Sequence, residues 1–235
     1  MTTGSRLPLA DWLGRHSWIG PLVALAALYV LFSLLAPDTF PTAGNLRTMV
    51  RQTTVVGIAA LGMTMVVVLG GIDLSVGSMV AFTTVVVAWL LQAGVPPAWA
   101  ALGGVAATSI CGLVNGWLIT SLRVMPFIVT LGAMGIIRGA AKGLAHEQKI
   151  DAPVTWLNDL IAELQAGSRW QILPPGLWAM IVLALVVGVV LRYTRFGRHI
   201  FAIGSNELTA RLCGIRVSRV KAGVYALSAA LAGVA

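Results

Sequence analysis

The sequence predicts an all-α protein, a polytopic bundle of about seven transmembrane helices forming one domain over residues 1–235. Hydrophobic residues make up 58% of the 235 residues and charged residues only 10%. The mean hydropathy is +0.89, which is far more apolar than a soluble domain of this size requires. The apolar runs are long and continuous and do not alternate with polar residues, so we expect helices and not the strands of a membrane barrel.

The candidate spans are apolar segments close to the ~20 residues that cross a bilayer. In chain order they are residues 18–36, 52–69, 74–95, 97–120, 125–141, 176–191 and a seventh that begins at residue 222. The seventh holds only residues 222–235, so we expect further C-terminal spans to be missing from this chain. Residues 1–16 carry Arg6 and Arg15 without an evident cleavage site, which indicates a signal anchor retained as the first span.

The net charge of +8 predicts membrane orientation and not nucleic-acid binding, because basic residues gather beside the spans. Counting spans from a cytoplasmic N-terminus places segment 192–221 inside. The basic residues in or beside this segment are Arg192, Arg195, Arg198, Arg211, Arg216, Arg219 and Lys221. Segment 142–175 falls outside and holds Glu147, Asp151, Asp159 and Glu163. Arg47 and Arg51 also fall outside, against the positive-inside rule, so the count is weakest at the second span.

The apolar stretch 52–95 is interrupted by the segment Gly70-Gly71-Ile72-Asp73-Leu74-Ser75-Val76-Gly77-Ser78. Paired glycines destabilise a helix, and an ionised Asp73 at the bilayer centre costs roughly 2.5–3.5 kcal/mol, so a helix is expected to end here. One interpretation is a discontinuous helix at membrane depth, with Asp73 or Ser75 capping the next helix. The other is a tight turn at the membrane surface between two full spans.

Small residues recur every four positions in two spans, which favours close helix packing in a membrane. The first stripe holds Gly104, Thr108, Gly112 and Gly116, and the second holds Gly135, Gly139 and Gly143. Asn115 is a polar residue in the span with the first stripe. Its amide is expected to bond a neighbouring helix or, alternatively, to contact a substrate.

The inner segment 192–221 contains a short helix framed by local signals. Asn206 is a good N-cap, Glu207 and Arg211 are spaced to pair, and Gly214 suits the left-handed position after the helix. Leu208 and Leu212 share one face. A helix this short falls below the ~12–15 residues needed for marginal stability in water, so it either packs on its own bundle or docks into a partner.

Motifs of enzymes and metal sites are absent from the sequence. There is no Gly-x-x-x-x-Gly-Lys-Ser/Thr phosphate loop, no nucleophile elbow, and no metal-ligand spacing around His16, His146 and His199. We therefore expect no catalytic residues, no bound metal and no cofactor.

Several segments together resemble the ribose/xylose-type sugar permeases of bacterial ABC importers. They are residues 70–78, Asn115-Gly116, residues 126–132 with Arg138-Gly139, and residues 202–206 leading to Cys213-Gly214-Ile215. The resemblance runs from about Phe40 to the last residue. Two departures are that Leu208-Thr209 stand where members usually have an alanine pair, and that members continue well beyond residue 235.

The resemblance implies a multi-pass permease subunit of the inner membrane that transports a monosaccharide and is not itself an enzyme. Its implied partners are an ATP-binding subunit inside, a periplasmic sugar-binding protein outside, a second permease copy in a homodimer, and membrane lipid. The implied coupling residues are Gly204, Asn206, Glu207, Leu208, Arg211, Leu212 and Gly214. The implied translocation-pathway residues are Gly70, Gly71, Asp73, Ser75 and Asn115.

Two other classes stay open from the residues alone. A self-contained secondary transporter or channel would use Asp73 as a proton or cation carrier. A structural membrane scaffold would tolerate changes in residues 70–78 provided that the helices still pack.

Overall fold

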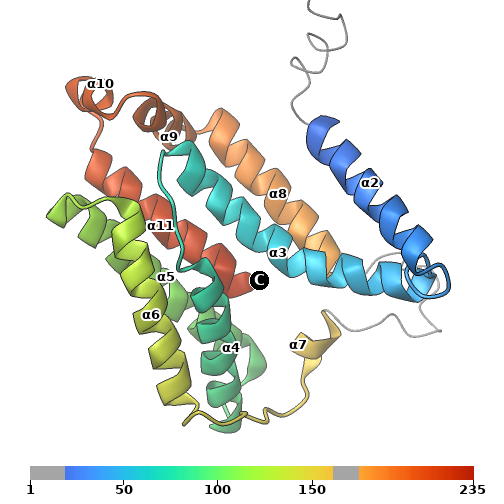
Figure 1. Ribbon diagram of the computed structural model, residues 1–235. Helices are drawn as coiled ribbons and strands as arrows, with labels where there is room; N and C mark the ends of the chain where they lie inside the picture. Colours follow the sequence, from blue (N-terminus) through green and yellow to red (C-terminus); the bar gives the residue numbers. More distant parts are fainter. Residues whose placement is uncertain (1–18, 161–174) are drawn as a thin grey trace, which may run out of the picture. The chain divides into compact units, whose positions relative to one another are not determined.

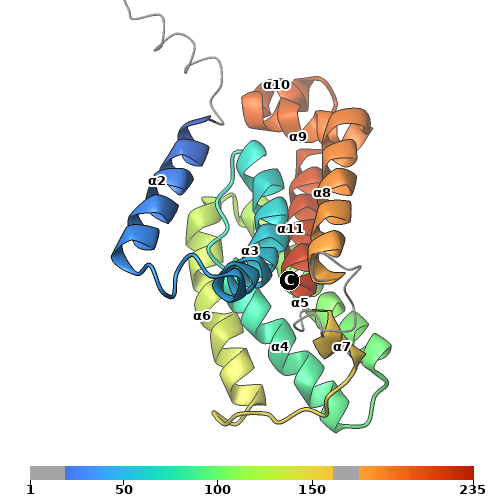
Figure 2. The same cartoon turned by 90° about the vertical axis from the view of Figure 1, so that its right-hand side faces the viewer.

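The structure is a computed structural model that describes residues 19–160 and 175–235. The signal-anchor prediction for residues 1–16 and the acidic residue Glu163 lie outside the described residues. The helices, shown in Figures 1 and 2, are α2 (Ile19–Leu35), α3 (Ala43–Val68), α4 (Val76–Gln92), α5 (Pro97–Leu122), α6 (Pro126–Leu144), α7 (Trp156–Asp159), α8 (Pro175–Tyr193), α9 (Arg195–Ser205), α10 (Glu207–Leu212) and α11 (Val217–Val234).

The seven predicted spans correspond to α2, α3, α4, α5, α6, α8 and α11, which confirms the all-α class. Within residues 19–160 and 175–235, four helices are long and apolar enough to cross a membrane: α3, α5, α6 and α8. Both α2 and α4 are apolar but shorter, with 17 residues each. Contacts divide the chain into two compact units, Met1–Val50 and Arg51–Ala235.

In the first unit, the end of α2 is held by aromatic contacts to the turn that follows it. The rings of Tyr29 and Phe32 each lie 5.4 Å from the ring of Phe40. Asn45 Nδ2 donates to the Phe40 carbonyl at 2.8 Å. These contacts form a small cluster between α2 and the first turn of α3.

In the second unit, α5 and α11 pack closely because small residues line the contact. A Cβ placed on Gly116 would lie 2.5 Å from Ala222 Cα, and one on Gly112 would overlap the Tyr225 carbonyl. The first predicted stripe therefore does pack helix on helix. A Cβ on Gly135, Gly139 or Gly143 would meet no described atom within 4 Å, so the second stripe makes no close contact in this part of the chain.

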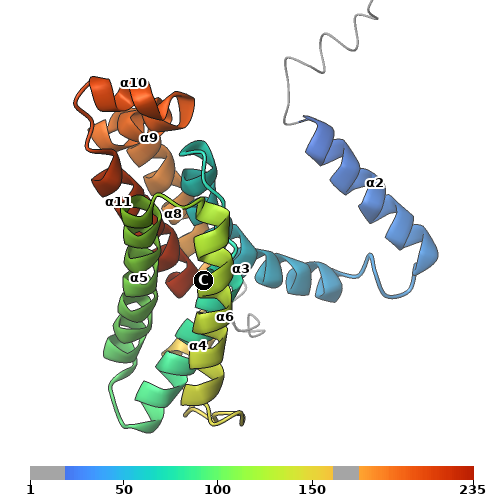
Figure 3. The same cartoon turned by 60° about the vertical axis from the view of Figure 1, so that its left-hand side comes forward.

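The helix α4 lies against α5 and α6, as Figure 3 shows. Thr83 Oγ1 of α4 donates to the Gly104 carbonyl of α5 at 3.1 Å, and a Cβ on Gly104 would lie 2.6 Å from Val87 Cγ2. At the far end of α4, Gln92 Nε2 donates to the Asp151 carbonyl at 3.0 Å. These bonds fix α4 against α5 and against the segment that follows α6.

The helix α9 was not predicted. Thr194 caps it by accepting from the Gly197 N–H at 3.1 Å, and its apolar side buries Ile200 and Ile203. A Cβ on Gly204 would collide with the Val68 carbonyl at the end of α3. The backbone of α9 therefore lies directly on the end of α3, and this contact places α10 next to the bundle.

Candidate functional site

The interruption between α3 and α4 is buried inside the second unit. Gly70 has a φ of +84°, a left-handed conformation that glycine adopts without strain, and residues 71–74 are not helical. In Figures 1 and 3 the chain runs back from the end of α3 beside the bundle, and α4 begins part of the way along α5 and α6. Asp73 is 3% exposed and Ser75 is fully buried. This geometry is that of a discontinuous helix and not of a turn at the end of the bundle.

The Asp73 carboxylate organises the start of α4. Its Oδ1 accepts from the Ser75 N–H at 2.8 Å and from the Ser75 hydroxyl at 2.5 Å. Ser75 occupies the N-cap position of α4, but its side chain makes no capping bond to that helix. The predicted cap is thus replaced by a local turn in which Asp73 binds Ser75.

Asn115 of α5 joins the same network. Its Nδ2 donates to the Ser75 hydroxyl at 3.1 Å, and the side chain is 2% exposed. The structure therefore brings together the predicted pathway residues Asp73, Ser75 and Asn115, with Gly70 and Gly71 in the adjoining backbone. The interhelical hydrogen bond expected of Asn115 is present.

Thr130 of α6 is a member of this site that was not singled out from the sequence. Its hydroxyl accepts from the Leu74 N–H at 3.2 Å and donates to the Ile72 carbonyl at 3.3 Å. It is fully buried. In the sequence, Thr130 is a threonine one turn inside an apolar span, within the segment 126–132 that resembles the family, and neither signal reveals which backbone its hydroxyl contacts.

Four polar atoms of the interruption, α4 and α11 are buried and have no hydrogen-bond partner within the described ranges. They are Asp73 Oδ2, Ser78 Oγ, Tyr225 Oη and Ser228 Oγ. The Tyr225 hydroxyl lies against Gly71, where a Cβ would come within 2.6 Å of it, and it interacts electrostatically with Asp73. Burying an unpaired polar group is costly, so these atoms are candidates for binding a polar molecule.

The second part of the candidate site is the short helix α10, which has the N-cap, the ion pair and the C-terminal glycine predicted from the sequence. Asn206 Oδ1 accepts from the Thr209 N–H at 3.0 Å, and Arg211 Nη2 donates to Glu207 Oε1 at 2.6 Å. Gly214 has a φ of +81°, as expected for the residue after the C-cap. The local signals in the sequence were therefore sufficient to place this helix.

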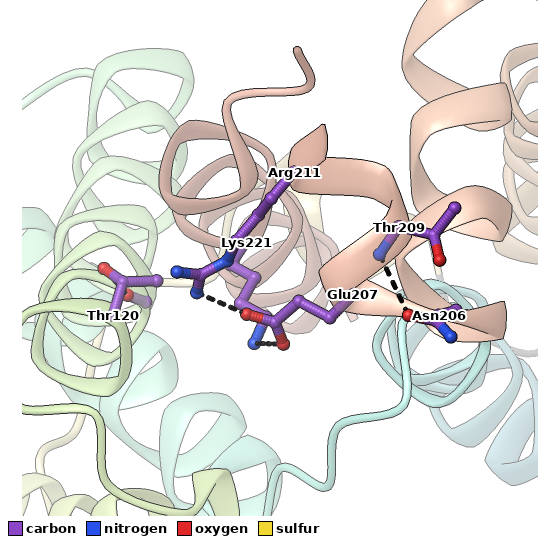
Figure 4. A network of polar contacts seen from close by, with 7 residues as sticks. Thr120, Asn206, Glu207, Thr209, Arg211 and Lys221 are labelled. Atoms are coloured by element: carbon purple, nitrogen blue, oxygen red, sulfur yellow. Dashed lines mark hydrogen bonds and ion pairs between the residues drawn. The ribbon is translucent and has the colours of Figure 1, made fainter. Parts of the chain in front are cut away.

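The sequence did not predict that a second cation binds Glu207. Lys221 Nζ of α11 donates to Glu207 Oε2 at 2.7 Å, and Figure 4 shows that Arg211 and Lys221 both point to this carboxylate. The bond from Lys221, followed by that from Arg211, holds the pKa of Glu207 below its ordinary value of 4.5 against the opposing effect of partial burial. Glu207 is therefore ionised at neutral pH and anchors α10 to α11.

The leucine face of α10 does not pack on the second unit. Leu208 is 74% exposed and Leu212 is 89% exposed, whereas Ala210 on another face is buried. Of the two alternatives for this helix, the exposed leucines favour docking into a partner. Gly204, the remaining predicted coupling residue, lies in α9 against the end of α3 and not on this face.

A metal centre is not formed by the described residues, which contain no group of three His, Cys, Asp or Glu side chains able to hold an ion.

Comparison with known proteins identifies the family. The family described as the permease component of branched-chain amino acid transport systems matches residues 45–235. The ribose import permease protein of Escherichia coli is 36% identical over 233 residues, covering 99% of this chain and 71% of the relative. The ribose import permease protein of Bacillus subtilis is 35% identical, covering 92% and 66%, and the fructose import permease protein of Rhizobium meliloti is 28% identical, covering 92% and 61%.

No solved structure matches the chain significantly. The family match and the apolar helices together make this a multi-pass protein of the inner membrane and a transport component, not an enzyme. The chain belongs to the family of ABC importer permeases that includes those for ribose, fructose and L-arabinose, as its motifs predicted.

Proposed function

We propose that this chain is the membrane-spanning permease subunit of an ATP-driven importer and translocates a monosaccharide delivered by a periplasmic binding protein. The names of its relatives support a sugar as the substrate. The structural observation that carries the proposal is the exposed leucine face of α10, because Leu208 and Leu212 are mostly exposed and add little to the packing of the described residues. A short helix with two protruding apolar side chains is suited to a groove in another protein.

The ATP-binding subunit binds α10 on the cytoplasmic side, and the N-terminus of the chain lies on that side as well. The support is the distribution of charge: segment 192–221 is basic, as expected of cytoplasmic loops. The periplasmic binding protein meets the opposite end of the bundle. Two copies of the chain, each a single permease domain surrounded by lipid, form the transporter.

Translocation proceeds by alternating access, and α11 transmits the movement. Lys221 in its first turns holds Glu207 of α10, and one turn further Tyr225 contacts the interruption at Gly71. A displacement of α10 by the ATP-binding subunit therefore reaches the buried residues beside Asp73 through one rigid helix. ATP drives the change because it binds one of the two conformations more tightly.

The translocation pathway passes the interruption, with Gly70, Gly71, Asp73, Ser75 and Asn115 near it. The support is the set of buried polar atoms without partners, which a passing sugar hydroxyl or water can satisfy once the helices move apart. Thr130 holds the same backbone, so it belongs to the positioning residues of this pathway.

The test is co-purification of the tagged chain from solubilised membranes, with mass spectrometry of bound proteins. Leu208→Ser/Leu212→Ser should lose an ATP-binding subunit that the unaltered chain retains, because only the docking face changes. Val154→Ser, which alters a side chain that is 87% exposed elsewhere, is the matched control and should retain it. Glu207→Ala/Arg211→Ala should also weaken retention, by loosening α10.

Retention of the ATP-binding subunit by all variants would contradict docking through α10. The self-contained transporter or channel predicts uptake without ATP and a pH dependence lost in Asp73→Asn. Family membership favours the ATP-driven importer over that class and over a passive scaffold.

A further inference from the structure

A cavity of about 420 Å³ opens where α10, the turn from α5 to α6 and the first turns of α11 meet. Six of its ten lining residues carry a polar or charged side chain. The lining residues on which the argument depends are Thr120, Arg123, Glu207, Arg211, Ser218 and Lys221. Figure 4 shows Thr120 on the α5 side of the Glu207 pairs.

The cavity has an excess of positive charge. Three cations, Arg123, Arg211 and Lys221, line it together with one carboxylate, that of Glu207. Glu207 is shared by Arg211 and Lys221, and the ion pairs of the described residues include none to Arg123. Arg123 therefore brings an uncompensated guanidinium to a concave site that also holds the Ser218 hydroxyl. Guanidinium and ammonium groups converging in a hollow are the chemistry that recognises phosphate.

Two exposed apolar side chains lie close to Arg123 in the sequence. Leu122 is 60% exposed and Met125 is 72% exposed, one on each side of Arg123. Both lie at the end of membrane helices, where acyl chains can contact them. The basic segment 192–221 assigns this end to the cytoplasmic leaflet, and basic pockets between helices on that side bind anionic headgroups.

We propose that this cavity binds the phosphate of an anionic phospholipid headgroup, with Arg123 as the main cation. A soluble anion would use the same cations but would gain nothing from Leu122 and Met125. A seated phosphate also attracts Lys221 and Arg211, which hold Glu207, so lipid binding and the position of α10 are linked. The site does not depend on transport activity for its existence or for its test.

The test measures binding of fluorescent phosphatidylglycerol to the purified chain in a neutral detergent, with phosphatidylcholine as the uncharged comparison. The unaltered chain should prefer phosphatidylglycerol. Arg123→Gln should weaken that binding about fivefold, the effect of one surface cation on an anionic lipid. Arg123→Lys should restore most of it. Arg138→Gln removes one cation from the second half of α6, outside the lining of this cavity, and should leave binding unchanged.

Size-exclusion profiles and unfolding temperatures of the variants show that each remains folded. An equal loss in Arg138→Gln and Arg123→Gln would overturn the proposal, because it would show binding to overall charge. Inorganic phosphate is the second probe. If it binds with the same dependence on Arg123 while phosphatidylglycerol does not bind, the ligand is a soluble anion and the lipid assignment is wrong.

Discussion

Lys221 of α11 donates to Glu207 of α10 at 2.7 Å across a separation of 14 residues in the sequence. The same helix places Tyr225 one turn further on, against Gly71 of the interruption. Lys221 and Tyr225 are four residues apart, so they project from the same side of α11. One rigid element thus touches both parts of the candidate site.

Lys221→Met should loosen α10 because it removes one of the two cations on Glu207. In a double-mutant cycle of unfolding with Glu207→Gln, the coupling free energy should be on the order of 0.5–1 kcal/mol, as for partly exposed ion pairs. Arg219→Met removes an equal charge from the same helix and should show no coupling to Glu207→Gln. If Lys221→Met and Arg219→Met couple equally to Glu207→Gln, the effect is one of overall charge. That result would contradict a specific ion pair between Lys221 and Glu207.

The Glu207 pairs should make stability depend on pH in the acid range. The pKa of Glu207 is lowered in the folded chain, so between that pKa and the ordinary value of 4.5 the unfolded chain binds more protons. The contribution is fully present above pH 4.5 and is lost as the pH falls through the folded pKa. Unfolding temperatures measured from neutral to acid pH should therefore fall more for the unaltered chain than for Glu207→Gln. Parallel curves for the two proteins would contradict the lowered pKa.

Local patterns in the sequence were sufficient for the helices and for α10, because caps, glycines and apolar periodicity act within a few residues. The same kind of signal marks α9, since Thr194 is a good N-cap and Ile200 and Ile203 share a face. What could not be predicted depends on distant partners. Thr130 meets the backbone at Leu74 across 56 residues, and no local pattern indicates that contact.

The sequence also could not predict whether the interruption lies at the surface or inside the bundle. Gly70 and Gly71 show that a helix ends, but the same residues suit a surface turn or a buried discontinuity. The choice is made by the hydrogen bond of Asn115 to Ser75 and by the packing of Tyr225 on Gly71. Both contacts come from helices that follow later in the chain.

Tyr225→Phe should leave the chain as stable as before or make it more stable. The hydroxyl is buried without a partner among the described residues, and removing such a group relieves a desolvation cost of about 1–3 kcal/mol. The unfolding temperature should therefore stay constant or rise. If the temperature falls, the hydroxyl has a partner in the folded chain, and the unsatisfied cluster at Asp73 would have to be revised.

Gly112→Ala should destabilise the bundle, whereas Gly139→Ala should not. A methyl group at residue 112 overlaps the backbone carbonyl of Tyr225, which cannot move without shifting α11, so we expect a loss of at least 1–3 kcal/mol, on the order of that for overpacked cores. At residue 139 the methyl group meets no described atom, and alanine favours a helix over glycine by ~1 kcal/mol. Unfolding in detergent measures both variants under one condition. Equal losses would show that the second glycine stripe also packs, against a second copy or another partner, and would contradict the finding that close packing distinguishes Gly112 from Gly139.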